Sequence, residues 1–143
     1  MPRKRRDPKL ETLRAVPIFS GCSDKELQAI ARMAKEVKFP EGKQICKQGQ
    51  SGLGLHVITD GRTKVVVNGR TRRRLGPGAF FGEMALLDNG PRSATVLAET
   101  PVSTLSLSAW DFKQAVKNHP TIAVKVLEEV SARLREVEAS ISS

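Results

Sequence analysis

Turn signals interrupt the middle of this chain every few residues, and they limit it to short strands. Between about residues 43 and 108 the turns include Asp60-Gly61, Asn68-Gly69, Gly76-Pro77-Gly78 and Asn89-Gly90-Pro91. The segments between the turns are β-branched or alternating, as in Gly54–Ile58, Thr63–Val67, Thr95–Ala98 and Val102–Leu107. Many short strands with closely spaced turns are typical of a small all-β barrel or sandwich. Asn68-Gly69 predicts a two-residue hairpin leading into residues 70–75, because both central residues of such a turn need a positive φ.

Helical patterns lie on both sides of this β region. Ser23 and Glu26 have the spacing of a capping box, and the apolar residues that follow predict a helix from residue 23 to residue 38. Residues 109–118 predict another helix, and Pro120 suits the first turn of a final one. We therefore expect one α+β domain over residues 10–143, with helices over about 10–38, strands over about 39–108 and C-terminal helices over about 109–141.

The positive charge of the chain is confined to two short segments. The formal net charge is +9 over 143 residues. Residues 1–9 carry five Lys or Arg and one Asp, and residues 62–74 carry six Lys or Arg and no acid, which leaves −1 for the rest. We interpret residues 1–9 as a disordered basic tail, and the hairpin cations as solvated charge on alternate positions. The alternative is that both segments bind nucleic acid or another acidic surface, although no base-stacking platform accompanies them.

Several classes of protein are excluded by the sequence. No apolar run approaches the roughly 20 residues of a membrane-spanning helix, and no secretory signal follows the basic start. Cys22 and Cys46 form neither a CxxC pair nor a metal spacing, so we expect reduced thiols and a cytoplasmic protein with no membrane partner. His56 and His119 are far apart and form no metal cluster. A cupin-like enzyme is therefore the least favoured function, and we expect no metal and no catalytic residue.

Residues 78–96 combine a short helix with an arginine. Glu83–Leu87 are good helix formers bounded by Gly82 and by the turn at residues 89–91. The first N–H groups of such a helix lack partners and attract an anion, and Gly82 lets a ligand approach the backbone closely. Arg92 can fork onto a phosphate at the same place, while Glu83 is better suited to accept hydrogen bonds from a sugar hydroxyl and to help hold Arg92. These groups predict a sugar-phosphate site; the alternative is an ordinary salt bridge between Glu83 and Arg92.

The same residues resemble a known family. The runs from Phe81 to Leu86 and from Pro91 to Val96 look like the phosphate-binding cassette of cyclic nucleotide-binding domains, of the type found in catabolite activator proteins, protein kinase A regulatory subunits and bacterial cyclic nucleotide-gated channels. Residues 17–19 resemble the entry to that domain, and residues 39–49 resemble its first β-hairpin. The resemblance covers residues 10–140. It implies an eight-stranded antiparallel β-roll, or jelly-roll barrel, with a short internal phosphate-binding helix, N-terminal helices and two C-terminal helices.

The resemblance also implies a role for each cassette residue. Glu83 contacts the ribose 2′-hydroxyl, and Arg92 contacts the exocyclic oxygens of the cyclic phosphate. The resemblance further implies that Gly82, Met84 and Ala85 offer backbone N–H groups to the ligand and that Ser93 offers its hydroxyl. Ala94 is the last of the expected ligand-binding residues. The base is expected to lie against apolar strand residues, for which Val65 and Leu75 are secondary candidates.

The ligand that the resemblance implies is cAMP or cGMP, with no other cofactor. We favour cAMP, although the Ser93 hydroxyl could bind the guanine amino group. In the family the final helix commonly folds over the base as a lid. Arg133 falls where some bacterial members have an arginine that stacks on the purine; the alternative is a surface pair with Glu129.

The final helix carries an apolar stripe with the spacing of a heptad seam, formed by Leu127, Val130, Leu134, Val137 and Ile141. The stripe either packs on the barrel or pairs two helices, so we expect a monomer or a weak dimer. The chain ends at Ser143, which leaves no room for a DNA-reading domain. We therefore expect a stand-alone bacterial regulatory module that relays binding to an effector protein through movement of the final helix.

Overall fold

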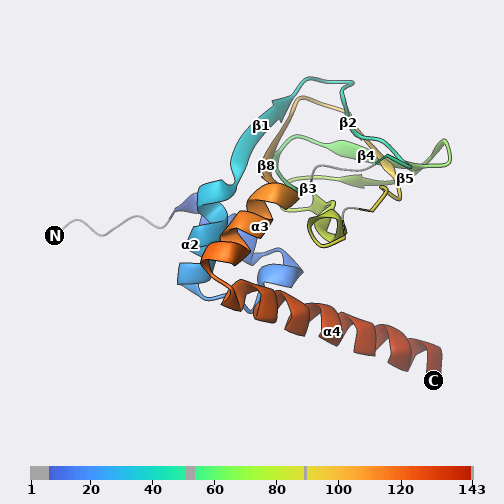
Figure 1. Cartoon of the computed structure of the whole chain (residues 1–143). Helices are drawn as coiled ribbons and strands as arrows, with labels where there is room; N and C mark the ends of the chain where they lie inside the picture. The colour runs from blue at the N-terminus through green and yellow to red at the C-terminus, as the bar shows by residue number, and fades with distance from the viewer. Residues whose placement is uncertain (1–6, 51–53, 89, 143) are drawn as a thin grey trace. The chain divides into compact units, whose positions relative to one another are not determined.

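The structure is a computed structural model, and it describes residues 7–50, 54–88 and 90–142 (Figure 1). The chain divides into two compact units. One unit combines the two ends of the chain, Met1–Arg32 and Gln114–Ser143, and the other is the continuous segment Met33–Lys113.

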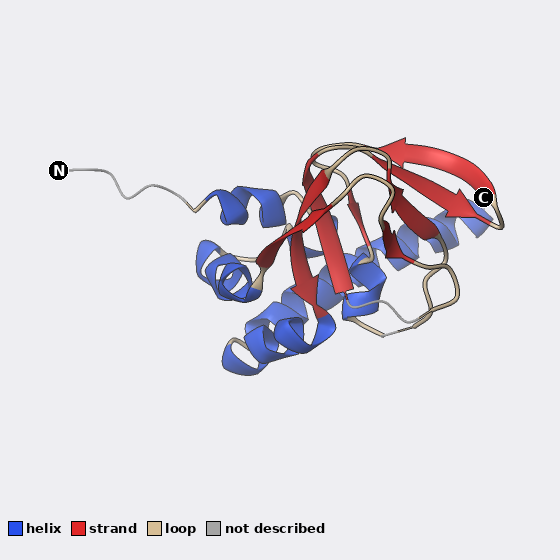
Figure 2. Ribbon diagram, turned by 90° about the horizontal axis from the view of Figure 1, so that it is seen from above, coloured by secondary structure: helices blue, strands red, loops and turns tan. Residues whose placement is uncertain are grey.

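The continuous unit is a β-roll of two four-stranded antiparallel sheets (Figure 2). The first sheet has the order β1 (Lys35–Phe39), β8 (Val102–Ser108), β3 (Gly54–Asp60) and β6 (Phe80–Phe81). The second has the order β2 (Gln44–Cys46), β7 (Thr95–Ala98), β4 (Thr63–Val67) and β5 (Arg70–Leu75). Ile58 of the first sheet and Ala98 of the second belong to one buried cluster, so the sheets share a core. The predicted eight-stranded antiparallel β-roll is confirmed.

The turn between β4 and β5 is the one that the sequence predicts. Asn68 has φ 51° and Gly69 has φ 78°, so both central residues lie in the left-handed region. Strands β4, β5 and β7 begin and end at the predicted residues. Local turn chemistry therefore defines most of the second sheet.

The other unit is helical. It contains α1 (Pro8–Arg14), the 3₁₀ turn η1 (Pro17–Phe19), most of α2 (Asp24–Met33) and α4 (Thr121–Ser142), and α1 and α4 both pack against η1. Helix α3 (Ala109–Asn118) is divided between the two units. Among the most deeply buried side chains of the helical unit are Leu13, Ile18, Phe19, Leu27 and Ile122. The fold therefore supports the α+β class.

The capping box at the start of α2 forms as predicted. The Ser23 N–H donates to Glu26 Oε1 over 2.8 Å, and the Glu26 N–H donates to Ser23 Oγ over 3.2 Å. The hydroxyl of Thr121, at the start of α4, donates to Glu26 Oε2 over 2.6 Å. The buried Glu26 carboxylate thus connects α2 to α4.

Two predictions near the N-terminus are wrong. The helix predicted to reach residue 38 ends at Met33, and Lys35–Phe39 form strand β1, in which Val37 pairs with Thr104 of β8. Residues 7–9 do not belong to a disordered tail, because Asp7 caps α1 by accepting from the Lys9 N–H over 3.0 Å and the helix begins at Pro8. Residues 1–6 lie outside the described residues. Within the described part of the chain, no helix has both the length and the apolar character needed to cross a membrane.

Candidate functional site

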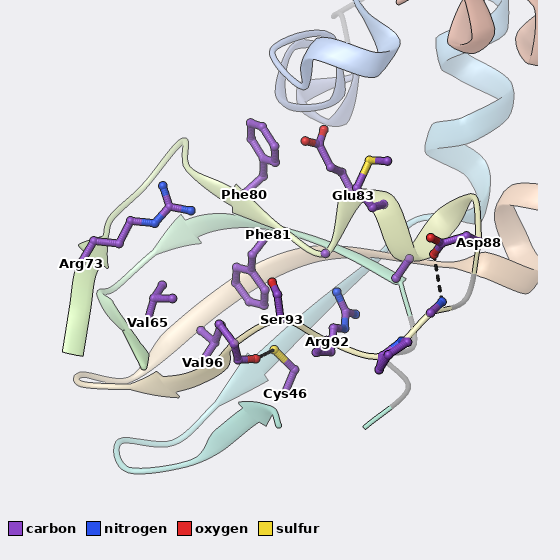
Figure 3. Close-up of a pocket in the computed structure, with 16 residues that line it drawn as sticks. Cys46, Val65, Arg73, Phe80, Phe81, Glu83, Asp88, Arg92, Ser93 and Val96 are labelled. Atoms are coloured by element: carbon purple, nitrogen blue, oxygen red, sulfur yellow. Dashed lines mark hydrogen bonds between the residues drawn. The ribbon is translucent and has the colours of Figure 1, made fainter. Parts of the chain in front are cut away.

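One cavity of the β-roll unit gathers both runs of the predicted cassette (Figure 3). Its volume is about 490 Å³. All seven predicted ligand-binding residues line it: Gly82, Glu83, Met84, Ala85, Arg92, Ser93 and Ala94. Residues from β2, β4, β5, β6 and β7 form most of the remaining wall, together with Asp88, Gly90 and Pro91 of the loop before β7.

The backbone at Gly82 shapes the start of the short helix. Gly82 has φ 81° and ψ 15°, and η2 (Glu83–Leu86) follows it directly. A Cβ atom at this position would overlap the Arg92 guanidinium and the Gly54 carbonyl oxygen. Glycine is therefore required both by the left-handed backbone and by the close approach of Arg92. The predicted short internal helix is present as a 3₁₀ turn, and its Ala85 N–H donates to the Gly82 carbonyl over 3.2 Å.

Arg92 is buried beside this turn. Only 9% of its surface is exposed, and its Nη2 donates to the Gly54 carbonyl over 2.5 Å. Its backbone is fixed as well, because its N–H donates to the Gln50 carbonyl and its carbonyl accepts from the Gly49 N–H. Its Nε has no hydrogen-bond partner among the described residues. A buried guanidinium with an unused donor is suited to an anion that enters the cavity.

Glu83 and Ser93 line the same cavity as Arg92 without duplicating its role. Glu83 is half-buried and Ser93 is exposed. Figure 3 shows the Glu83 carboxylate pointing away from the Arg92 guanidinium. A carboxylate in that position leaves the guanidinium available to an anion, and it can itself accept hydrogen bonds from hydroxyl groups.

The wall opposite Arg92 contains one of the two predicted base-contact strand residues. Val65 of β4 is buried and lines the cavity. Leu75 does not line it, because its side chain packs against the cluster of Ile58, Ala98 and Val102. The contact of Leu75 with a base therefore finds no support in this cavity and stays a prediction. Arg133 lies on α4, in the helical unit, and its contact with a base stays a prediction.

Sequence reasoning missed two polar residues of this wall. Cys46 of β2 is partly buried, and its Sγ donates to the Ala94 carbonyl over 3.9 Å. Arg73 of β5 also lines the cavity, whereas the hairpin cations were expected to face solvent. Both residues reach the cassette only through long-range strand pairing, so no local motif signals them.

A second cavity, of about 590 Å³, shares Cys46 and Arg92 with the first and is lined by His56. His56 Nδ1 lies 2.7 Å from Ser106 Oγ, and its ring stacks on Phe81 with centroids 5.0 Å apart. Burial lowers the pKa of His56 to about 4, and the nearby charge of Arg92 acts in the same direction. His56 is therefore a neutral part of the strand interior at physiological pH.

The other arginines between residues 62 and 74 do not line the cavity that contains the cassette. Arg74 Nε lies 2.9 Å from Glu99 Oε1, which balances its charge. Arg62, Arg70 and Arg72 are exposed, and no carboxylate of the described residues lies within ion-pair distance of them. In the same part of the chain, no group of three or more His, Cys, Asp or Glu could hold a metal ion.

Comparison with known proteins gives one consistent picture. Residues 36–119 match a family model described as "Cyclic nucleotide-binding domain". The chain is 38% identical over 126 residues to a cyclic nucleotide-gated potassium channel of Mesorhizobium japonicum, covering 88% of this chain and 35% of the channel. It is 31% identical over 134 residues to the cyclic AMP receptor protein of Thermus thermophilus, covering 90% of this chain and 62% of that protein. The chain therefore spans less than two thirds of either relative.

A solved structure agrees with these matches. The N-terminal domain of a transcriptional regulator from Streptomyces coelicolor superimposes with a TM-score of 0.82 at 30% identity. The match covers 90% of this chain and 93% of that one.

Proposed function

Because the chain belongs to the family of cyclic nucleotide-binding domains, which are regulatory modules, we propose that it binds a cyclic nucleotide in the cavity of about 490 Å³. The single observation that carries the proposal is Arg92. Its guanidinium is buried, touches the cavity and has an Nε–H without a partner among the described residues. Leaving such a donor unsatisfied is costly, and a phosphate oxygen would satisfy it.

The remaining cassette residues take roles that fit their positions. The cyclic phosphate lies at Arg92 and Ser93, and the ribose lies at Gly82 and Glu83, whose carboxylate accepts from the 2′-hydroxyl. Met84, Ala85 and Ala94 close the cavity around these groups. The base extends toward Val65, which supplies an apolar surface.

The nucleotide that we favour is cAMP over cGMP. Support comes from the family resemblance and from the similarity to a relative that is itself a cyclic AMP receptor protein. The Ser93 hydroxyl is the feature that would favour cGMP, because it can accept from the guanine amino group.

Binding is proposed to act through α4 in a cytoplasmic regulatory module without enzymatic activity. We expect the helix to change position when the nucleotide enters, with Arg133 contacting the base, and to pass the change to an effector protein. The apolar stripe of α4 supports this role, since Leu127, Leu134, Val137 and Ile141 are each more than half exposed. A second copy of the chain in a weak dimer is one partner that this stripe fits.

Calorimetric titration of the purified chain with cAMP and cGMP tests the proposal. We expect saturable binding of both nucleotides, with the tighter binding for cAMP. Arg92→Ala should weaken binding about a hundredfold or more, because a charge-assisted contact to the phosphate is lost. Arg70→Ala is the matched control, since it removes the same charge from an exposed position away from the cavity. Equal affinity of Arg92→Ala and the parent would contradict the proposed site.

A second candidate function rests on the exposed cations of the β4–β5 hairpin. Arg62, Arg70 and Arg72 could bind an acidic surface such as duplex DNA. Strand β5 is also the edge of its sheet, where cations protect against pairing with other chains. Binding of duplex DNA that persists at about 0.15 M salt would support this function. If the chain does not bind duplex DNA at that salt concentration, protection of the sheet edge is the role of these cations.

A further inference from the structure

Arg73 is the one cation of the β4–β5 hairpin that lines the nucleotide cavity. It is exposed, and no carboxylate of the described residues lies within ion-pair distance of its guanidinium. Figure 3 shows it beside Val65, with Arg92 on the other side of the cavity. A guanidinium here is far from the proposed phosphate position and close to the proposed base.

A β-bulge directs Arg73 into the cavity. A regular two-residue hairpin would pair Val67 with Arg70, Val66 with Thr71 and Val65 with Arg72. The first two pairs form, but the register then shifts, and Val65 pairs with Arg73. Arg72 is the extra residue of this bulge.

The shift exchanges the faces of two arginines. Residues that are directly opposite in an antiparallel pair share one face of the sheet. Val65 is buried and lines the cavity, so its partner Arg73 lies on the cavity side. Without the bulge, Arg72 would have taken that place. Bulges beside binding sites commonly re-aim a side chain in this way.

We infer that Arg73 is a specificity-determining residue that donates hydrogen bonds to the N7 edge of a purine base. The inference rests on the proposed function, because it takes the phosphate to be at Arg92 and the base at Val65. Arginine carries only donors. Adenine presents one acceptor on this edge, N7, whereas guanine presents N7 and O6 together and can accept both arms of the fork. Pyrimidines have no N7.

Arg73 therefore selects purine over pyrimidine cyclic nucleotides. Arg73 also reduces the expected difference in affinity between cAMP and cGMP. The reason is that guanine can accept hydrogen bonds from both arms of the guanidinium, whereas adenine can accept only one.

Four proteins and four ligands test this inference. The proteins are the parent chain, Arg73→Ala, Arg73→Lys and Arg72→Ala, and the ligands are cAMP, cGMP, cCMP and 7-deaza-cAMP, in which a C–H replaces N7. The parent should bind 7-deaza-cAMP about tenfold more weakly than cAMP, which corresponds to one charge-assisted hydrogen bond. Arg73→Ala, which has no side-chain donor, should weaken cAMP by a similar factor, weaken cGMP further, and bind 7-deaza-cAMP and cAMP alike.

The controls separate hydrogen bonding from charge. Arg72→Ala removes the same charge from the neighbouring residue outside the cavity, and it should bind every ligand as the parent does. Arg73→Lys keeps the charge but donates from a single nitrogen, so it should keep most of the affinity for cAMP and lose the extra gain for cGMP.

Two results would overturn the inference while leaving the proposed function intact. One is a parent that binds cAMP and 7-deaza-cAMP equally, which needs no variant to fold. The other is an equal loss of affinity in Arg73→Ala and Arg72→Ala. A parent that binds none of the four nucleotides would overturn the proposed function, and this inference with it.

Discussion

At Gly82, backbone conformation and side-chain packing independently favour glycine over every other residue. The positive φ disfavours any L side chain by about 1–2 kcal/mol, and a Cβ would overlap the guanidinium of Arg92 and the carbonyl of Gly54. The overlap with the guanidinium matters for function because it would displace Arg92, the residue that we assign to the phosphate.

Gly82→Ala should therefore lower both stability and ligand affinity. We expect a loss of about 2 kcal/mol or more in the free energy of unfolding, measured in urea, and at least about tenfold weaker cAMP binding. Gly78→Ala is the matched control, since Gly78 has φ 90° but nothing lies within 4 Å of its Cβ position. Gly78→Ala should show only the backbone cost. If both variants keep the parent's affinity, Gly82 does not position Arg92.

A pH dependence of stability should arise from His56. Burial holds the pKa of this histidine at about 4, below its usual value of 6.5. Between these values only the unfolded chain takes up the proton, so stability should fall as the pH drops from about 6.5 to about 4. The loss is on the order of 3 kcal/mol at the acid end. Above pH 6.5 this effect is absent.

Urea unfolding at a series of pH values between 7.5 and 4 checks this dependence. His56→Gln should flatten the profile in that window, because it removes the titrating group from β3. His119→Gln, at the end of α3, tests whether loss of any histidine has the same effect. An unchanged slope in His56→Gln would show that other groups cause the acid sensitivity.

At the scale of elements, Glu26 connects two helices that are far apart in the sequence. Its carboxylate accepts the Ser23 N–H at the start of α2 and the Thr121 hydroxyl at the start of α4. Glu26→Ala should cost about 2 kcal/mol of unfolding free energy, because a helix cap is lost and two donors lose their acceptor. Glu128→Ala, on an exposed position of α4, should be near neutral. Equal stability of the two variants would contradict this role.

The same hydrogen bonds lower the pKa of Glu26, first that from the Ser23 backbone and then that from Thr121. For a lowered carboxyl pKa, the stabilisation is present above the usual value of 4.5 and is lost as the pH falls through the folded-state value. Glu26→Ala should therefore show a flatter stability profile below pH 4.5 than the parent.

Elements defined by local chemistry could be predicted from the sequence, and those defined by distant pairing could not. The turn at Asn68-Gly69 and the cassette around Gly82 are local, and both form where predicted. The sequence predicts helix where strand β1 forms, because Ala34 and Val37 continue the apolar spacing of α2. Its partner, β8, lies almost 70 residues away, and no local pattern reports that pairing.

The candidate site divides in the same way. The residues from 82 to 94 are close in sequence, so one motif identified them all, and they line one cavity. Arg73 could not be predicted from the sequence, because a bulge in β5 places Arg73 rather than Arg72 opposite Val65. Leu75 packs against the core cluster, and no local pattern predicts that packing because residues of both sheets form the cluster.

At the scale of the whole molecule, the apolar stripe of α4 predicts self-association. Leu127, Leu134, Val137 and Ile141 are spaced as a heptad seam and are each more than half exposed. We expect sedimentation velocity to show a weak, concentration-dependent dimer. Leu134→Glu should remain monomeric, because a charge would have to be buried in the seam. Ala132→Glu adds the same charge to an exposed position off the stripe and should dimerise like the parent.

Coupling between the nucleotide and this dimer tests the proposed relay through α4. If the nucleotide repositions α4, it should change the dimer dissociation constant, and by linkage the dimer should change nucleotide affinity by a corresponding factor. Calorimetric titration of the parent with cAMP, at protein concentrations above and below the dimer dissociation constant, should then give two different affinities. Leu134→Glu should give only the monomer value at both concentrations. Identical affinities throughout, with dimerisation unaffected by cAMP, would show that the signal does not leave the module through this surface.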